Sequence, residues 1–134
     1  MNRGLLAFLA TCIVASAALY GCASAPVVIP ASLTSGELFQ RAQDASDRGD
    51  YRGAMQYYAA FQERFPSDLA HAAWASYEIA FLYHKMGQDE TTIKLLNELL
   101  ARYSTEGDAL PPAVRALSQE LISRLGPSTP AKAP

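Results

Sequence analysis

The chain of 134 residues contains only two cysteines, and its formal net charge is only −2. So few cysteines cannot form the disulfide framework of a small secreted scaffold. Without a basic surplus the chain also has no electrostatic footprint for nucleic acid. Proline is scarce too, because Pro66 is the only one between residues 31 and 110, and no alternating strand pattern appears there. These absences favour one small, all-α domain.

Residues that could carry chemistry are equally sparse. No glycine-rich phosphate loop is present, and no serine stands in a nucleophile-elbow or Ser-x-x-Lys setting. His71 and His84 are 13 residues apart, and neither has a second ligand at metal-binding spacing. We therefore expect no enzymatic activity, no metal site and no cofactor.

Residues 1–21 have the plan of a secretory signal peptide, with Arg3 ahead of an apolar run over residues 4–19. That run is short for a membrane-spanning helix, which needs about 20 residues. It ends in Leu19-Tyr20-Gly21-Cys22, which resembles the bacterial lipobox, Leu-x-Gly-Cys. The resemblance implies a lipoprotein whose Cys22 thiol is acylated, for example with palmitate, before the leader is removed. The alternatives are an uncleaved anchor or an ordinary signal peptide.

Lipidation would decide where the protein resides. Tyr20 departs from the usual small or β-branched residue of the lipobox, a looser form that spirochaetes among other bacteria tolerate. Each buried methylene of an acyl chain contributes about 0.8 kcal/mol, so two or more chains would anchor the protein stably. Ala23 follows the acylated position, where aspartate would resemble an inner-membrane retention signal. The resemblance therefore implies an outer-membrane lipoprotein, lipid-anchored on the periplasmic face.

The rest of the chain divides into a predicted tether over residues 22–33, a helical domain over 34–125 and a disordered tail over 126–134. The spacing Thr34-x-x-Glu37 is typical of a capping box at a helix start. Further start and stop signals predict five helices. Helix starts are indicated by Asp50, by either Ser67 or Asp68, and by Asp89. Helix ends are indicated by Gly49, Pro66 and Gly87, and Pro111-Pro112 precedes the last helix.

The helices are predicted to pair into repeats. The pattern that begins at Gly49 and includes Tyr51, Ala54 and Tyr58 recurs 38 residues later from Gly87. This period is typical of helical-hairpin arrays, and the pattern resembles the tetratricopeptide repeat. The resemblance implies a short helical-hairpin solenoid with repeats at about 35–68 and 73–106 and a closing helix at about 111–125. In such a hairpin small residues, here Ala42 and Ala80, let two helices approach closely.

The long period and the tract from Arg64 to Asp68 look similar to tetratricopeptide proteins of the bacterial envelope. Two such proteins are the lipoprotein subunit of the β-barrel assembly machine and the periplasmic protein associated with Tol–Pal. The resemblance implies a scaffold or adaptor that binds an envelope protein in outer-membrane assembly or maintenance. Alternatives are a transporter accessory lipoprotein that binds a small ligand, and a pilotin-like escort of a secretion pore.

Two repeats and a closing helix fall below the usual minimum of about three units, since each hairpin buries its apolar face only against a neighbour. We therefore expect a marginally stable domain that a partner or self-association would help.

The tetratricopeptide resemblance also indicates binding residues, because the first helix of each hairpin lines the concave groove of the family. This assigns Phe39 in the first repeat. In the second repeat it assigns Trp74, Tyr77, Phe81, His84 and Lys85. The first four of these share one helix face, and exposed aromatics are typical anchors for peptides or partner helices. The alternative is that the stripe is core, packed on the first hairpin or on the closing helix.

Overall fold

A computed structural model describes residues 27–126 of the chain. The predicted leader, Cys22 and the tail after Gly126 lie outside the described residues. Within that range the chain is all α-helical, which confirms the predicted fold class. The elements are α2 (Ser35–Asp47), α3 (Tyr51–Arg64), α4 (Leu69–Lys85), α5 (Asp89–Glu106), the short 3-10 turn η2 (Gly107–Ala109) and α6 (Pro112–Leu125).

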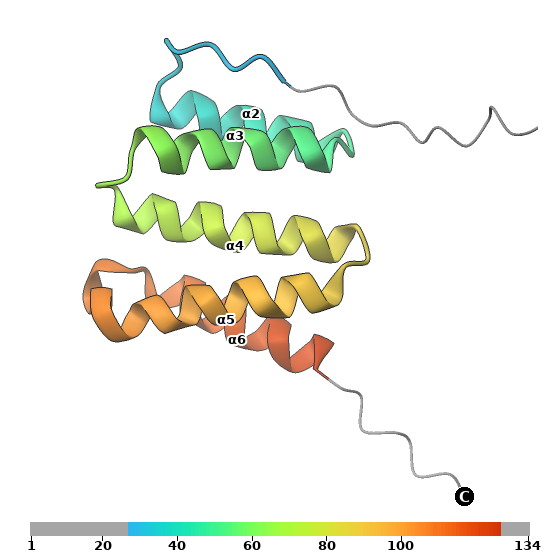
Figure 1. The fold of residues 1–134 in the computed structure, drawn as a ribbon, viewed down its shortest axis with the longest axis vertical. Helices are drawn as coiled ribbons and strands as arrows, with labels where there is room; N and C mark the ends of the chain where they lie inside the picture. The colour runs from blue at the N-terminus through green and yellow to red at the C-terminus, as the bar shows by residue number, and fades with distance from the viewer. Residues whose placement is uncertain (1–26, 127–134) are drawn as a thin grey trace, which may run out of the picture.

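The helices form a short solenoid in which each element packs on the next. Helices α2 and α3 make the first hairpin and α4 and α5 the second, and α6 contacts both α5 and α4. Figure 1 shows α4 between α3 and α5, with α2 behind α3 and α6 behind α5. The first helix of each hairpin therefore lies in one layer with α6, and the second helices form the other layer. None of the helices described in residues 27–126 has the length and apolar character needed to cross a membrane.

Local signals explain where these helices begin and end. At the start of α2 the Thr34 hydroxyl accepts from the Glu37 N–H at 3.3 Å, and the Glu37 carboxylate accepts from the Thr34 N–H at 2.8 Å, so the predicted capping box is confirmed. Asp68, rather than Ser67, caps α4. Gly49 and Gly87 have φ of 79° and 74°, the left-handed conformation that lets the chain reverse after a helix.

Small residues set the spacing between helices. Ala42 and Ala80 are fully buried, as the repeat pattern predicted. Ser118 lies a further 38 residues along the chain and is also fully buried. Its hydroxyl donates to the Val114 carbonyl at 2.7 Å, so its burial leaves no unpaired donor. Helix α6 therefore has the position of the first helix of a third repeat.

The buried residues form three clusters along the solenoid. One fills the first hairpin and reaches α4 through Ala72, Ala75 and Leu82. The other two join α4 and α5 to α6, one of them through Leu110 and Val114 and the other through Leu121. The core is thus divided between neighbouring helices, as expected for a repeat architecture.

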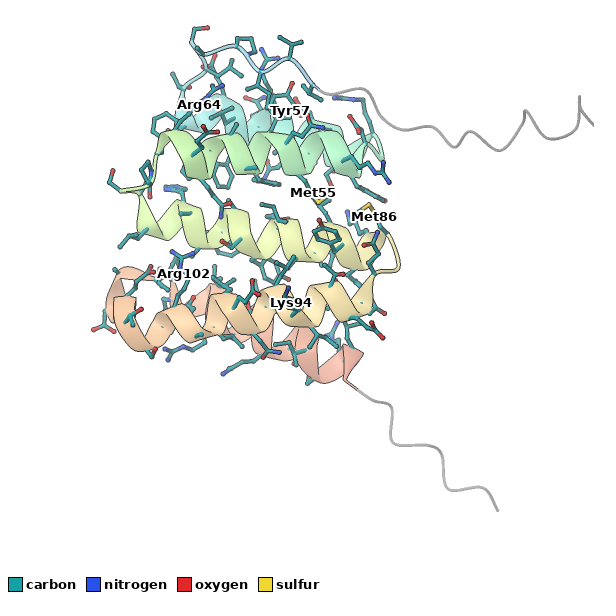
Figure 2. The ribbon with its side chains drawn as sticks, viewed as in Figure 1. Met55, Tyr57, Arg64, Met86, Lys94 and Arg102 are labelled. Carbon is teal, nitrogen blue, oxygen red and sulfur yellow. The ribbon has the colours of Figure 1, made fainter. Side chains whose placement is uncertain are left out.

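The predicted tether over residues 22–33 needs a correction. From Val27 onward the segment is extended but held on the first hairpin. The Val27 N–H donates to Gln56 Oε1 at 2.8 Å, and the Arg64 guanidinium donates to the carbonyls of Pro30 at 2.8 Å and Ile29 at 3.2 Å. Figure 2 shows Arg64 at the end of α3 beside this segment. The sequence missed these contacts because their partners lie 29 to 35 residues away.

Candidate functional site

The aromatic stripe predicted on α4 is a continuous ladder of rings. Trp74 meets Tyr77 edge-on, with ring centroids 6.2 Å apart and planes at 90°. Tyr77 stacks on Phe81 at 6.2 Å, and Phe81 is followed by His84 at 6.0 Å. Spacings of three and four residues place these side chains on one face of an α-helix. All four are half-buried.

The buried side of the ladder packs on the elements that follow it. Trp74 and Tyr77 contact a cluster that includes Leu99 and Val114, and Tyr77 and Phe81 contact a cluster that includes Leu121. Burial raises the pKa of the Tyr77 hydroxyl, and the Glu78 carboxylate raises it further. The stripe therefore contributes to the packing of the closing helix and also keeps part of each ring at the surface. Its role in binding stays a prediction.

Two polar residues complete one end of the ladder. His84 Nδ1 lies 2.7 Å from the Asp89 carboxylate at the start of α5. Lys85 Nζ lies 5.5 Å from the centre of the Tyr51 ring and 5.4 Å from that of Phe81, within the range of a cation–π contact. Lys85 is exposed, so it offers a positive charge at the end of an apolar strip.

Phe39, the remaining predicted binding residue, lies in the first hairpin, apart from this ladder. Its ring is 4.7 Å from Phe61, 5.3 Å from Tyr58 and 5.7 Å from His71, in each case edge-on. Together with Gly36 it lines a small apolar hollow. The structure therefore separates Phe39 from the α4 ladder rather than joining them in one contiguous cluster.

Glu78 is a feature of this surface that the sequence reasoning missed. It is half-buried, and burial raises the pKa of its carboxyl, while the Lys85 charge lowers that pKa. Burial raises the pKa of Tyr58 and of Tyr77, and the Glu78 charge raises the pKa of both further. None of the ion pairs recorded within residues 27–126 includes Glu78.

Hollows of a different kind lie on the other side of α4. One has a volume of about 540 Å³ and lies between α3 and α4, where Met55 and Met86 approach each other (Figure 2). A second, of about 220 Å³, lies between α3, α4 and α5 and is bordered by Arg102. Both are open to solvent. Across the described range 27–126, no three histidine, cysteine or acidic side chains are grouped so that they could hold a metal ion.

The fold defines a class of protein, a short solenoid of helical hairpins. Comparison with known families identifies which one. The family model described as tetratricopeptide repeat matches residues 31–68 and 74–105. The chain belongs to the tetratricopeptide repeat family, whose members are in general protein-binding scaffolds without catalytic activity. The two matched segments agree with the two hairpins.

One relative among curated proteins is an uncharacterized protein of Treponema pallidum (strain Nichols). It is 33% identical over 112 residues, which cover 81% of this chain and 45% of that protein. The chain therefore spans less than half of the relative's length. No solved structure matches the chain.

Proposed function

We propose that this chain is a lipid-anchored adaptor of a bacterial envelope, and that it binds a segment of a partner protein across the groove formed by α2 and α4. The observation that carries the proposal is the half-exposed ladder from Trp74 to His84. Aromatic rings supply a large contact area with few torsions to fix, and interface energy concentrates in such residues. Their buried sides are already fixed by packing, so little side-chain entropy is lost on binding.

Charges along this surface support a peptide or helix as the ligand. Lys85 lies at one end of the ladder and is exposed, while Glu78 lies beside the ladder with a raised pKa. An apolar strip with one cation and one carboxylate beside it favours an amphipathic segment over a strongly charged one. It also gives the groove a direction, because the two charges lie at different places along α4.

The anchor rests on the lipobox resemblance at Cys22. The relative comes from a spirochaete, one of the groups in which looser lipoboxes are tolerated, which supports reading Tyr20 as compatible with acylation. Because the chain is held on α3 from Val27 onward, only the five steps from Cys22 to Val27 separate the lipid from the domain. That length spans at most about 18 Å. The adaptor would therefore work within a short distance of the membrane, on the periplasmic face of the outer membrane.

The groove is tested by site-specific photo-crosslinking in intact cells. A photoreactive residue in place of exposed Lys85 should give a discrete adduct with a partner protein. The same residue in place of Lys94, whose side chain is 76% exposed on α5, is the matched control and should give none. Equal labelling from both positions, or no adduct from Lys85 in a protein at its normal level, would argue against groove binding. The identity of the adduct also separates an assembly adaptor from a pilotin-like escort, which would capture a secretion pore.

The anchor is tested separately with the variant Cys22→Ala. Metabolic labelling with an alkyne analogue of palmitate should mark the parent protein but not the variant, and the variant should leave the membrane fraction. Labelling that persists in Cys22→Ala would contradict acylation at this residue. The small-ligand alternative requires an enclosed apolar cavity. The hollows described in residues 27–126 are open, which favours a polypeptide ligand.

A further inference from the structure

The 38-residue register aligns every position of the first repeat with one of the second, and the pair formed by Gly36 and Trp74 differs most in size. Phe39 corresponds to Tyr77 and Phe61 to Leu99, so large residues match large residues. Gly36, however, corresponds to Trp74. The smallest residue of the chain thus stands where the other repeat has the largest.

In the second repeat the Trp74 side chain fills the space over its hairpin. It packs against the cluster that contains Ala73 and Leu99, and its ring meets Tyr77 edge-on. The second repeat therefore shows which group fits the space enclosed by these equivalent positions. An indole there has an apolar cluster to pack on and an aromatic neighbour at 6.2 Å.

In the first repeat the same space is empty of protein. Gly36 has no side chain, and a Cβ added to it would meet none of the described atoms within 4 Å. The result is a hollow of about 220 Å³ lined by Ser35, Gly36, Phe39, Phe61 and His71. Ser35 and Phe61 correspond to Ala73 and Leu99, which are members of the cluster that holds Trp74. The hollow is thus the counterpart of the space that the indole occupies.

We propose that this hollow is an anchor site for one large aromatic side chain, tryptophan first, of a partner polypeptide. The inference rests on the proposed function, because it specifies the residue by which a partner segment is held. A cavity of about 150 Å³ suffices for benzene, so 220 Å³ is the right scale for a single ring system and too small for a drug-sized ligand.

The walls favour an aromatic group over an aliphatic one. Phe39 and Phe61 already meet edge-on, and His71 lies 5.7 Å and 6.2 Å from their ring centres. A further ring can join them with the edge-to-face geometry that aromatic pairs prefer. Ser35, which also lines the hollow, has a hydroxyl that can accept from an indole N–H.

The first test is binding of N-acetyl-tryptophanamide to the full chain in detergent, followed by ¹⁵N–¹H NMR. The amide signals of Gly36, Phe39 and His71 should shift in a saturable way at millimolar concentrations of the probe. N-acetyl-alaninamide should leave them in place. Shifts absent at these residues, or equal for both probes, would overturn the proposal.

The second test fills the hollow from within. Gly36→Trp should place an indole where Trp74 lies in the other repeat and weaken probe binding at least about tenfold. Gly36→Ala is the matched control, because it adds only a methyl group at the same helical position, and it should bind as the parent does. If Gly36→Trp loses its native spectrum, Gly36→Leu serves in its place. Undiminished binding in a folded filled variant would overturn the proposal.

These outcomes are distinguishable from failure of the adaptor role. Probe binding at Gly36 without any Lys85 adduct in cells would support the anchor site and contradict the adaptor. A Lys85 adduct that persists in Gly36→Trp cells would support the adaptor and exclude the hollow as its anchor. If a second copy of this chain occupies the hollow, crosslinking from Lys85 in cells should give a homodimeric adduct. That result would contradict binding of a separate partner protein.

Discussion

The two hairpins repeat the same backbone plan with different side chains. Ala42 and Ala80 are fully buried at equivalent positions, and Gly49 and Gly87 both have positive φ. These positions are shared because the backbone itself requires them, either for close approach of helices or for a left-handed turn. At positions where the size of the side chain matters, and not the backbone conformation, the two hairpins differ. The first has aromatic residues in the hairpin core, while the second has them along α4, packed partly on α5 and α6.

A second contrast concerns how helices are held at their starts and crossings. Asp50 caps α3 by accepting from the Gly53 N–H at 3.0 Å, whereas the equivalent Gln88 makes no such side-chain bond to α5 in the described structure. The second hairpin has Thr92 where the first has Ala54. The Thr92 hydroxyl lies 3.1 Å from the Ala80 carbonyl and 3.2 Å from that of Gln88. In the second hairpin the Thr92 hydroxyl can thus bond to α4 and to the residue before α5, whereas in the first hairpin Ala54 makes only a contact between small side chains.

The largest expected effect comes from removing the centre of the aromatic core. Phe61→Ala should lower the free energy of unfolding by about 3–5 kcal/mol, because Phe61 is fully buried and contacts three rings. The equivalent Leu99→Ala should cost about 2–5 kcal/mol, at the lower end, since it loses no aromatic pairs. Urea denaturation followed by circular dichroism measures both. A larger loss for Leu99→Ala would show that the second hairpin, not the first, dominates stability.

The next effect tests the capping contrast. Asp50→Ala should lower the free energy of unfolding by about 0.5–2 kcal/mol, because it removes the acceptor for the Gly53 N–H. Gln88→Ala, at the equivalent position of the second hairpin, should change it by less than about 0.5 kcal/mol. Thermal unfolding of the pair gives the difference directly. Equal losses would mean that Gln88 caps α5 in solution.

A smaller effect is expected from the interhelix hydroxyl. Thr92→Val keeps the shape of the side chain and removes its hydrogen bonds, so it should cost about 0.5–1.5 kcal/mol. The control is Thr91→Val. Thr91 is one residue earlier on the same helix and only half-buried, so this change should alter the free energy of unfolding by less than about 0.5 kcal/mol. A neutral Thr92→Val would indicate that apolar packing compensates for the lost bond.

The smallest effect is a pH dependence of opposite sign in the two hairpins. Hydrogen bonds from Thr34 lower the pKa of Glu37, so the folded state binds its proton less tightly than the unfolded state. The stability from Glu37 is present above its ordinary pKa of 4.5 and is lost as pH falls below that value. Burial raises the pKa of Glu78, so its contribution is favourable below 4.5 and lost as pH rises.

This difference is measured by comparing two variants between pH 3 and pH 7. Glu37→Gln should flatten the loss of stability on acidification. Glu78→Gln should gain stability over the parent as pH rises above the ordinary glutamate pKa of 4.5. The Glu37 effect is small because water screens an exposed carboxylate, and the Glu78 effect is small because that side chain is only half-buried. A Glu78→Gln variant that is less stable than the parent at pH 7 would instead indicate that the charged carboxylate has a favourable partner.

Much of the fold could be read from the sequence because its signals are local. Thr34 and Glu37 are three residues apart, and a helix start needs no more information than that. The glycines that follow helices and the 38-residue register gave the hairpins and their order. The ladder on α4 was also predictable, since one helix fixes the spacing of its own side chains. Ser118 was the missed member of this series, although its spacing from Ala80 was available.

The rest depended on contacts that no local pattern encodes. Arg64 donates hydrogen bonds to the carbonyls of Pro30 and Ile29, which lie 34 and 35 residues earlier in the chain. Whether the α4 ladder was groove or core depended on where α6 docks, and the structure shows that α6 covers one side of it. The hollow beside Gly36 is lined by Phe61 and His71 from two other helices as well as by residues of α2, so it depends on how three helices pack.

The sequence by itself therefore determined the helices, their pairing and the repeat family, because caps, turn glycines and small close-approach residues act through the local backbone. The tertiary structure alone decided how much of each aromatic ring remains exposed, how the pKa of Glu78 is raised and where space is left unfilled. These properties depend on how neighbouring helices pack, and packing is set by side chains far apart in the chain.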